Sequence, residues 1–508
     1  MNKKVILKRV GQILLLFILL SMIILYWADR QLYKYRGGFT EVIEAPGKQH
    51  QYSDLIIRHA HILAPDCSHF LTGYQVVLKN GSIVAVEPDS ISRQGMKVLD
   101  AQGQFLIPGL VDSHVHLKAS KNDLYLYLAN GVTYVREMAG NPTHLTWREE
   151  ITQGTMGPQV FVASEKVNSN PGMAGLYDSW TRNRINFTSE EAAKKKIAQL
   201  KSQGFDAIKI STHLNAEMYE ATLKYAQEQG LPVIGHIPVA VGLNKALYGG
   251  QKEYAHVEEI TKSKMWEYGR IGSDNASEFL AWLERQSDSL ARLIREEDIA
   301  VTSTIWLMES LPKQKFELPS TIRQIKLAFA NPGQIEGTLF ARGWLPGNNY
   351  YMESEEVTNN PKRAKASREF WETYVKAIHI MTAALARNGV QLMAGTDACG
   401  ALTIPGFSLH DELVSLSQAG MTPAQVLFSA TVAPGKWMKT KTGIIQEGYQ
   451  ADLVLLSQNP LEDIQHTRSI ESVFRGGYWL QKSHLQDLLE AVKKANDEAR
   501  TVDISPFQ

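Results

Sequence analysis

The sequence predicts an α/β protein: a (β/α)8 barrel (a TIM barrel) joined to a small β-sandwich and preceded by a transmembrane helix. Three observations lead to this prediction. Short apolar runs alternate with helical stretches through the middle of the chain, and β-like segments flank that middle part on both sides. An uncharged apolar run lies near the N-terminus.

Length and composition allow this architecture and exclude some functions. The chain has 508 residues, 44% of them hydrophobic, with 53 basic and 53 acidic side chains. This length accommodates a barrel and a smaller domain. A balanced charge gives no overall attraction to nucleic acid, so we expect no nucleic-acid partner. Cys67 and Cys399 are the only cysteines, which excludes a disulfide framework but leaves their pairing open.

The N-terminal segment has the features of a membrane anchor. Residues 10–28 contain no charge and are long enough to cross a bilayer as a helix. Tyr26 and Trp27 stand at the end of this run, where aromatic side chains prefer the interface, and basic residues precede it. No small-x-small cleavage site follows. We therefore predict an uncleaved signal anchor over 1–33 and a single-pass membrane protein whose body is extracytoplasmic (periplasmic).

The predicted β-sandwich draws on both ends of the chain. Residues 34–52 are polar and turn-rich and are predicted to be a linker. Short β-like runs fill 53–107, with "KNGS" as a hairpin signal between two of them, and similar runs occur in 439–482. We expect these two parts to form one sandwich, followed by a C-terminal helix and tail over 483–508.

The predicted barrel occupies residues 108–438. Its eight strand candidates are residues 109–116, 131–138, 159–165, 205–211, 231–237, 253–259, 299–305 and 390–398. Good helix formers closed by glycine lie between several of them. The long gap near 306–365 is predicted to be an insertion on the rim, where substrate would enter.

Chemically active side chains gather at the predicted C-terminal ends of these strands, where the active site of such a barrel lies. His114 and His116 are two apart in the first strand, so their side chains share a face. The other strand ends contribute Lys209, His236, His256 and Asp397. Converging imidazoles and a carboxylate are the ligands that a divalent metal ion needs.

Each of these residues alone has a simpler explanation. Lys209 could reach solvent from the end of its strand, Asp397 could cap the following helix, and the histidines could be ordinary core or edge residues. Three further histidines lie near strand ends and could support a ligand or contact substrate: His144, His213 and His410. No single residue indicates a metal site, but the presence of all six at the strand ends favours one.

The motifs "PGLVDSHVH", "FDAIKI", "VIGHI", "YAHVE" and "MAGTDA", in this order, resemble the amidohydrolase superfamily of metal-dependent hydrolases. The flanking segments, such as "GIIQEGYQADLVLLSQNPLEDI", resemble the branch that contains imidazolonepropionases and Xaa-Pro dipeptidases. The resemblance covers about residues 53–481. The membrane anchor lies outside it, and the gap after the seventh strand departs from the usual pattern.

The resemblance implies a binuclear site of the carboxylated-lysine type. One divalent ion would be held by His114, His116 and Asp397, the other by His236 and His256, with Lys209 bridging both as a carbamate formed with carbon dioxide. Zinc is the expected metal. Imidazolonepropionases use one ion and no lysine carbamate, so "AIKI" favours the dipeptidase-like side.

The function implied by the resemblance is hydrolysis of an amide or peptide bond in a small molecule or short peptide. Two metal ions would lower the pKa of a bridging water, and Asp397 would take its proton and deliver it to the leaving amine. Hydrolysis of a cyclic amide, lactone or phosphoester on the same site is one alternative. An inactive anchored binding protein is another. A homo-oligomer is compatible with the sequence.

Overall fold

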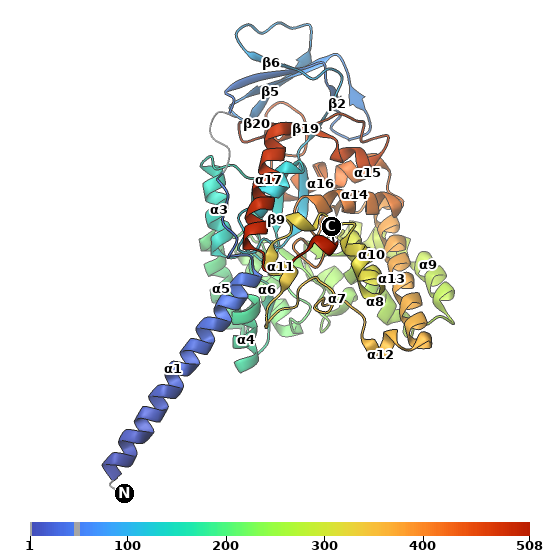
Figure 1. Ribbon diagram of the computed structural model, residues 1–508. Helices are drawn as coiled ribbons and strands as arrows, with labels where there is room; N and C mark the ends of the chain where they lie inside the picture. The colour runs from blue at the N-terminus through green and yellow to red at the C-terminus, as the bar shows by residue number, and fades with distance from the viewer. Residues whose placement is uncertain (1–2, 45–50, 508) are drawn as a thin grey trace.

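The computed structural model describes residues 3–44 and 51–507 and has a parallel β-barrel at its centre (Figure 1). The barrel strands are β8 (Leu110–Val115), β9 (Val132–Glu137), β10 (Gln159–Val162), β13 (Ile208–Ile210), β14 (Val233–Gly235), β15 (Glu253–Ala255), β16 (Ala300–Thr302) and β17 (Leu392–Met393). Neighbours pair in parallel, and single bridges Ala163–Ala207 and Val115–Ala398 join the remaining edges. Each strand lies inside its predicted range, in agreement with the predicted fold class.

Helices surround the barrel and cover its apolar strands. They are α2 (Asp123–Ala129), α3 (Pro142–Thr152), α5 (Glu190–Gln203), α6 (Ala216–Glu228), α7 (Gly242–Gly249), α8 (Val257–Tyr268), α9 (Ala276–Glu296), α13 (Pro361–Arg387), α14 (Phe407–Gln418), α15 (Pro423–Ser429) and α16 (Val432–Met438). Local sequence sets several ends: the Ser189 and Asn215 side chains accept N-cap hydrogen bonds for α5 and α6. Gly204 ends α5 in the left-handed conformation.

The β-sandwich is built from both ends of the chain, as predicted. Its first sheet has the order β5 (Ser82–Pro88), β4 (Tyr74–Lys79), β1 (Asp54–Arg58), β6 (Lys97–Asp100). The second has the order β20 (Tyr478–Gln481), β19 (Ile470–Arg475), β18 (Leu453–Leu456), β7 (Phe105–Pro108), β2 (His61–Leu63), β3 (Phe70–Leu71). Strand β7 pairs antiparallel with β18, so the two chain ends meet in one sheet. Leu55, Leu106 and Phe474 are buried in the core between the sheets.

The segment between β16 and α13 forms a small unit on the barrel rim. It contains α10 (Ile305–Ile322), α11 (Pro332–Glu336) and α12 (Glu355–Thr358). Ile322, Ile335 and Trp344 form its buried core with Leu402, which follows the last barrel strand. The predicted insertion near 306–365 therefore has a hydrophobic core of its own and packs beside the end of the eighth strand.

Helix α1 (Lys3–Tyr35) projects from the body on the side opposite the sandwich (Figure 1). Its end is bound to the rim unit: Lys34 Nζ lies 2.9 Å from Glu336 Oε2. Glu336 also accepts a hydrogen bond from the backbone N–H of Thr501 at 2.6 Å, so both chain ends meet on it. The predicted linker 34–52 begins against the barrel, since Arg36 O accepts a hydrogen bond from Ala119 N. Residues 45–50 lie outside the described residues.

The two cysteines are free and buried. The Sγ of Cys67 lies 3.8 Å from Thr431 Oγ1, and the Sγ of Cys399 lies 3.6 Å from Asp123 Oδ2. Burial raises the pKa of Cys67 to about 11 and also raises the pKa of Cys399. Both side chains are therefore protonated thiols near neutral pH, which answers the pairing question that the sequence leaves open.

A buried ion pair inside the barrel allows a test of how much this pair contributes to stability. Arg136 on β9 and Glu253 on β15 are fully buried, with 2.5 Å between Nη2 and Oε2. We expect Glu253→Gln to lower the free energy of unfolding by about 3 kcal/mol, because it leaves the guanidinium buried without its counter-charge. Glu220→Gln, which removes an exposed pair with Lys245, should cost less than about 1 kcal/mol. Denaturant unfolding of both variants measures this, and equal stability would contradict it.

Candidate metal centre

The first and eighth barrel strands bring three of the predicted ligands together. His114 and His116 occupy the end of β8 and the residue after it, and Asp397 follows β17. Asp397 Oδ1 lies 2.9 Å from His116 Nε2 and 3.4 Å from His114 Nε2. One atom from each residue falls within 4.8 Å of the other two, so the three could hold one metal ion.

The chemistry of these atoms fits a metal ion better than a set of hydrogen bonds. His116 Nε2 and Asp397 Oδ1 are close, yet both are buried atoms without a hydrogen-bond partner among the described residues. Buried polar atoms are nearly always partnered in folded proteins. Two ligand atoms that point at a common ion would be close together and unbonded in this way, so the residues present fit a metal.

Strands four to six supply the other predicted ligands. Lys209 on β13 is fully buried, and its Nζ lies 3.5 Å from His114 Nε2. The His256 ring centre is 4.4 Å from that of His114 and 5.3 Å from that of His236. All six side chains predicted as ligands therefore converge at the C-terminal end of the barrel, with Lys209 beside His114.

Two polar residues that the sequence analysis missed orient the histidines of the second group. His236 Nδ1 lies 3.3 Å from Glu259 Oε1, and His256 Nδ1 lies 2.6 Å from Thr304 Oγ1. Such partners fix the ring and leave Nε2 for a metal. Glu259 stands three residues after His256, in the first turn of α8, so the carboxylate in "HVEE" was the available signal. Thr304 follows β16 and gives no comparable signal.

The charge states favour metal binding. Burial lowers the pKa of His236 to about 4 and holds those of His114 and His256 well below their usual range, so these rings are neutral, as metal ligands must be. Burial, assisted by the nearby Lys166, lowers the pKa of Lys209 to about 7. Much of Lys209 is then a neutral amine near neutral pH. The neutral amine is the form that can react with carbon dioxide.

Two glycines leave room for the metal-ligand side chains to lie close together. A Cβ on Gly235 would lie 2.4 Å from Ile210 O and 3.0 Å from Lys209 Cδ. A Cβ on Gly395 would lie 2.7 Å from His114 Cβ. The glycines of "VIGHI" and "MAGTDA" are therefore needed where the strands crowd the site.

The three other histidines lie outside this cluster. His410 is buried, with Nδ1 2.9 Å from Thr467 Oγ1 and Nε2 3.1 Å from Asn130 O, so both ring nitrogens have structural partners. His144 lies in the first turn of α3, and its Nε2 is 3.0 Å from the Lys118 carbonyl oxygen. His213 is exposed after β13. Their predicted contacts with substrate stay predictions.

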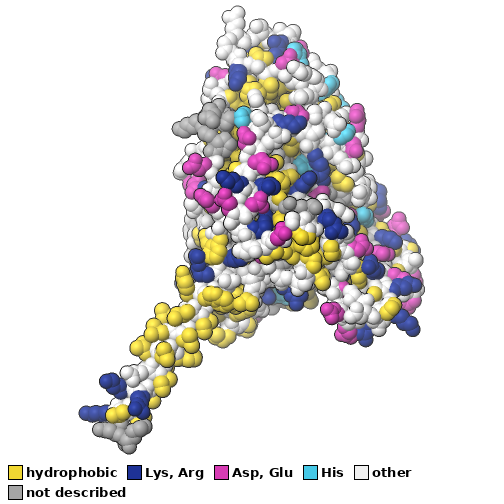
Figure 2. All heavy atoms as spheres, viewed as in Figure 1, with side chains coloured by type: hydrophobic (Ala, Val, Ile, Leu, Met, Phe, Trp, Pro, Cys, Tyr) yellow, Lys and Arg dark blue, Asp and Glu magenta, His cyan; other side chains and the backbone are white. Residues whose placement is uncertain are grey.

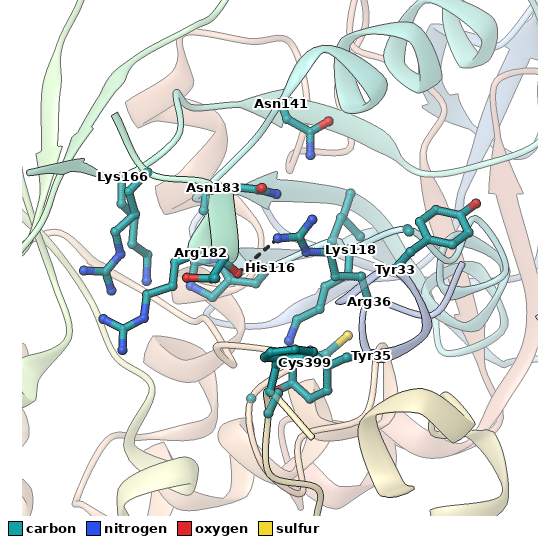
Figure 3. A pocket seen from close by; sticks show the side chains of 18 of the residues that line it. Tyr33, Tyr35, Arg36, His116, Lys118, Asn141, Lys166, Arg182, Asn183 and Cys399 are labelled. Carbon is teal, nitrogen blue, oxygen red and sulfur yellow. Dashed lines mark hydrogen bonds between the residues drawn. The ribbon is translucent and has the colours of Figure 1, made fainter. Parts of the chain in front are cut away.

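A cavity of about 1090 Å³ opens beside His116. Its walls come from the end of α1, the loops after β8 and β10, the end of α4 (Gly172–Arg182) and the rim unit. Its charged lining consists of six basic side chains, Arg36, Lys118, Lys166, Arg182, Arg184 and Arg342, and two acidic ones, Glu137 and Glu165. Figure 3 shows several of these bases around His116. Sequence reasoning missed this basic lining.

Known proteins share sequence and fold with this chain. A family model described as "Amidohydrolase family" matches residues 105–480. The chain is 24% identical over 260 residues to adenine deaminase 1 from Latilactobacillus sakei, which covers 48% of this chain and 43% of that protein. It is 36% identical over 99 residues to ochratoxinase from Aspergillus niger, 18% of this chain and 19% of that protein. The chain thus matches less than half the length of these curated relatives.

Solved structures share the fold over most of the chain. A putative prolidase from Bifidobacterium longum superposes with a TM-score of 0.59 at 20% identity, covering 87% of this chain and 99% of that one. The Aspergillus niger ochratoxinase structure gives 0.59 at 17% identity, covering 85% and 96%. Since the family model extends from β7 into β20 and includes all six converging residues, this chain belongs to the amidohydrolase family.

Proposed function

We propose that this protein is a metal-dependent hydrolase that cleaves the amide or peptide bond of a small substrate. The observation that carries the proposal is the convergence of six ligand-type side chains at one end of the barrel, with Lys209 buried beside His114 and with His116 lining the adjoining cavity. A deaminase and a prolidase among the relatives support cleavage of a carbon–nitrogen bond.

The residues would divide between two divalent ions, with zinc the best match for imidazole and carboxylate ligands. His114, His116 and Asp397 would hold one ion, and His236 and His256 would hold the other. Lys209 would react as a neutral amine with carbon dioxide and lose one proton, which gives an anionic carbamate with two oxygen ligands, whereas its ammonium form would repel the ions. When bound, the ions supply Lewis-acid chemistry that activates water and polarises the scissile carbonyl.

Asp397 has the position of a proton shuttle. Its side chain is 22% exposed and lies 2.9 Å from His116. Although burial opposes ionisation, the adjacent His116 holds the pKa of Asp397 well below its usual range, so it is a carboxylate at neutral pH. It accepts the proton of the attacking water and returns it to the leaving nitrogen.

The proposal is tested by metal analysis of the purified protein and a substrate panel. The panel contains dipeptides, N-acyl amino acids, cyclic amides, lactones and phosphoesters. Turnover of linear amides is expected. Turnover of only the other classes would contradict amide hydrolysis, and no turnover of any class would favour an anchored binding protein.

We expect Lys209→Ala to lose most bound metal and nearly all turnover. Without the anionic bridge, two dications would repel each other, and at least one should leave the site. A short carboxylic acid could enter the vacated space and partly restore both metal and rate. Metal content per chain, measured beside turnover, tests this. Lys245→Ala, at the exposed lysine paired with Glu220, is the control and should keep both ions. Two ions retained by Lys209→Ala would contradict the bridging role.

Asp397→Asn should separate metal binding by this residue from proton transfer by it. The amide oxygen can still coordinate, so most of the metal should remain, while kcat falls by about a hundredfold or more. Metal content and turnover are measured on the same preparation. Near wild-type turnover would remove Asp397 from the shuttle role.

We also propose that α1 is an uncleaved anchor that holds the body outside the cytoplasm. Residues 4–35 are long and apolar enough to span a membrane. The segment that follows the apolar run is bound to the body, since Leu32 is buried and Lys34 pairs with Glu336. The basic residues before the run favour a cytoplasmic N-terminus.

Protease accessibility tests this orientation. Protease added to intact spheroplasts should digest the body and spare only the anchor and its short tail. A cytoplasmic protein serves as the control for membrane integrity. A body that is digested only after the membrane is broken would reverse the orientation.

A further inference from the structure

The membrane anchor and the metal site share one cavity. Tyr33, Tyr35 and Arg36, at the end of α1 and just after it, line the cavity together with His116 (Figure 3). Lys118, two residues beyond His116, places its Nζ 4.8 Å from the centre of the Tyr35 ring. The end of the anchor is thus a wall of the active site.

The position of Trp27 indicates where this cavity wall lies relative to the bilayer. This residue ends the apolar run, where aromatic side chains lie at the bilayer interface. Its ring is 6.0 Å from that of Phe340, and Phe340 lines the cavity. Tyr35 is eight residues further along α1, about 12 Å at the helical rise. The cavity therefore begins at the interface and reaches just beyond the headgroups.

Apolar side chains surround this end of the body. Met173, Leu176 and Tyr177 on α4 are 80%, 65% and 57% exposed, and Leu339 beside Phe340 is 79% exposed. We call these four residues the apolar collar. Figure 2 shows hydrophobic side chains continuing from α1 onto the adjoining base of the body. Because the collar adjoins the interface end of α1, the bilayer is the surface that would cover it.

The cavity itself is suited to an anion. Six basic and two acidic side chains line it. The side chains of Lys166 and Arg342 have no hydrogen-bond or ion-pair partner within the described part of the chain, while Arg36 is held by the Thr181 carbonyl at 3.1 Å. Unpaired cations in a cavity wall favour a carboxylate or another anionic group on the ligand.

We propose that the substrate is a membrane-borne anionic amide of the N-acyl amino acid type. Its carboxylate pairs with Lys166 and Arg342, its amide lies at the metal centre, and its acyl chain leaves over the collar into the bilayer. The proposal rests on the amide hydrolysis proposed above. Water is added across the bond: the C–N bond breaks, a C–O bond forms, and the nitrogen takes both protons. The products are a fatty carboxylate and an amino acid with a free ammonium group.

The test uses the full-length protein in phospholipid vesicles with three substrates: N-palmitoylalanine, N-acetylalanine and the carboxamide of N-palmitoylalanine. We expect kcat/KM for N-palmitoylalanine to exceed those of the other two by about tenfold or more, because the chain concentrates the substrate in the bilayer and the carboxylate meets the cations. Equal values for all three would overturn this inference and leave amide hydrolysis intact. No turnover of these or of dipeptides would overturn both.

Variants separate the membrane contact from the anion contact. Leu176→Asp combined with Leu339→Asp should lower kcat/KM for N-palmitoylalanine about tenfold and leave that for N-acetylalanine unchanged, which also shows that the variant folds. Ile91→Asp, an exposed apolar residue in the sandwich, is the matched control and should change neither. Arg342→Gln should raise KM for N-palmitoylalanine but not for its carboxamide. Unchanged N-palmitoylalanine kinetics in the collar variant would overturn the membrane route.

Discussion

Closure of the barrel between its first and last strands is the constraint on which the site depends. Asp112 on β8 accepts hydrogen bonds from Thr396, from Oγ1 at 2.7 Å and from the backbone N–H at 3.1 Å. The backbone N–H of Asp397 bonds to His114 O at 2.8 Å. These bonds join segments almost three hundred residues apart, and they set His114 beside Asp397. The sandwich adds a further link between the two parts of the chain, because β7, which leads directly into β8, pairs with β18.

The parts of the structure that could be predicted from sequence are those with local signals. Parallel strands buried on both faces appear as short apolar runs, so all eight could be located. Their C-terminal ends meet at one face of the barrel, so His236 and His256 could be assigned to one site without knowledge of any contact. The sandwich followed from β-like runs on both sides of the barrel.

The remaining features depend on contacts between distant segments. Thr304 orients His256 across 48 positions, and Arg342 reaches the cavity from the rim unit. Nothing local marks either residue. His410 shows the opposite difficulty: it lies close to the eighth strand in sequence, but its ring faces Thr467 and Asn130. Likewise, the polar composition of residues 34–52 does not reveal that Arg36 lines a cavity.

The meeting of both chain ends on Glu336 has a consequence for biosynthesis. Ribosomes make Lys34 long before Thr501, and Glu336 binds both of them. Helix α1 is complete while most of the barrel is still untranslated, but the full contact at Glu336 cannot form until Thr501 has emerged. If α1 is the membrane anchor proposed above, the cavity wall beside it is secured in its final form only after residue 501 has been made, when the chain is already tethered to the bilayer.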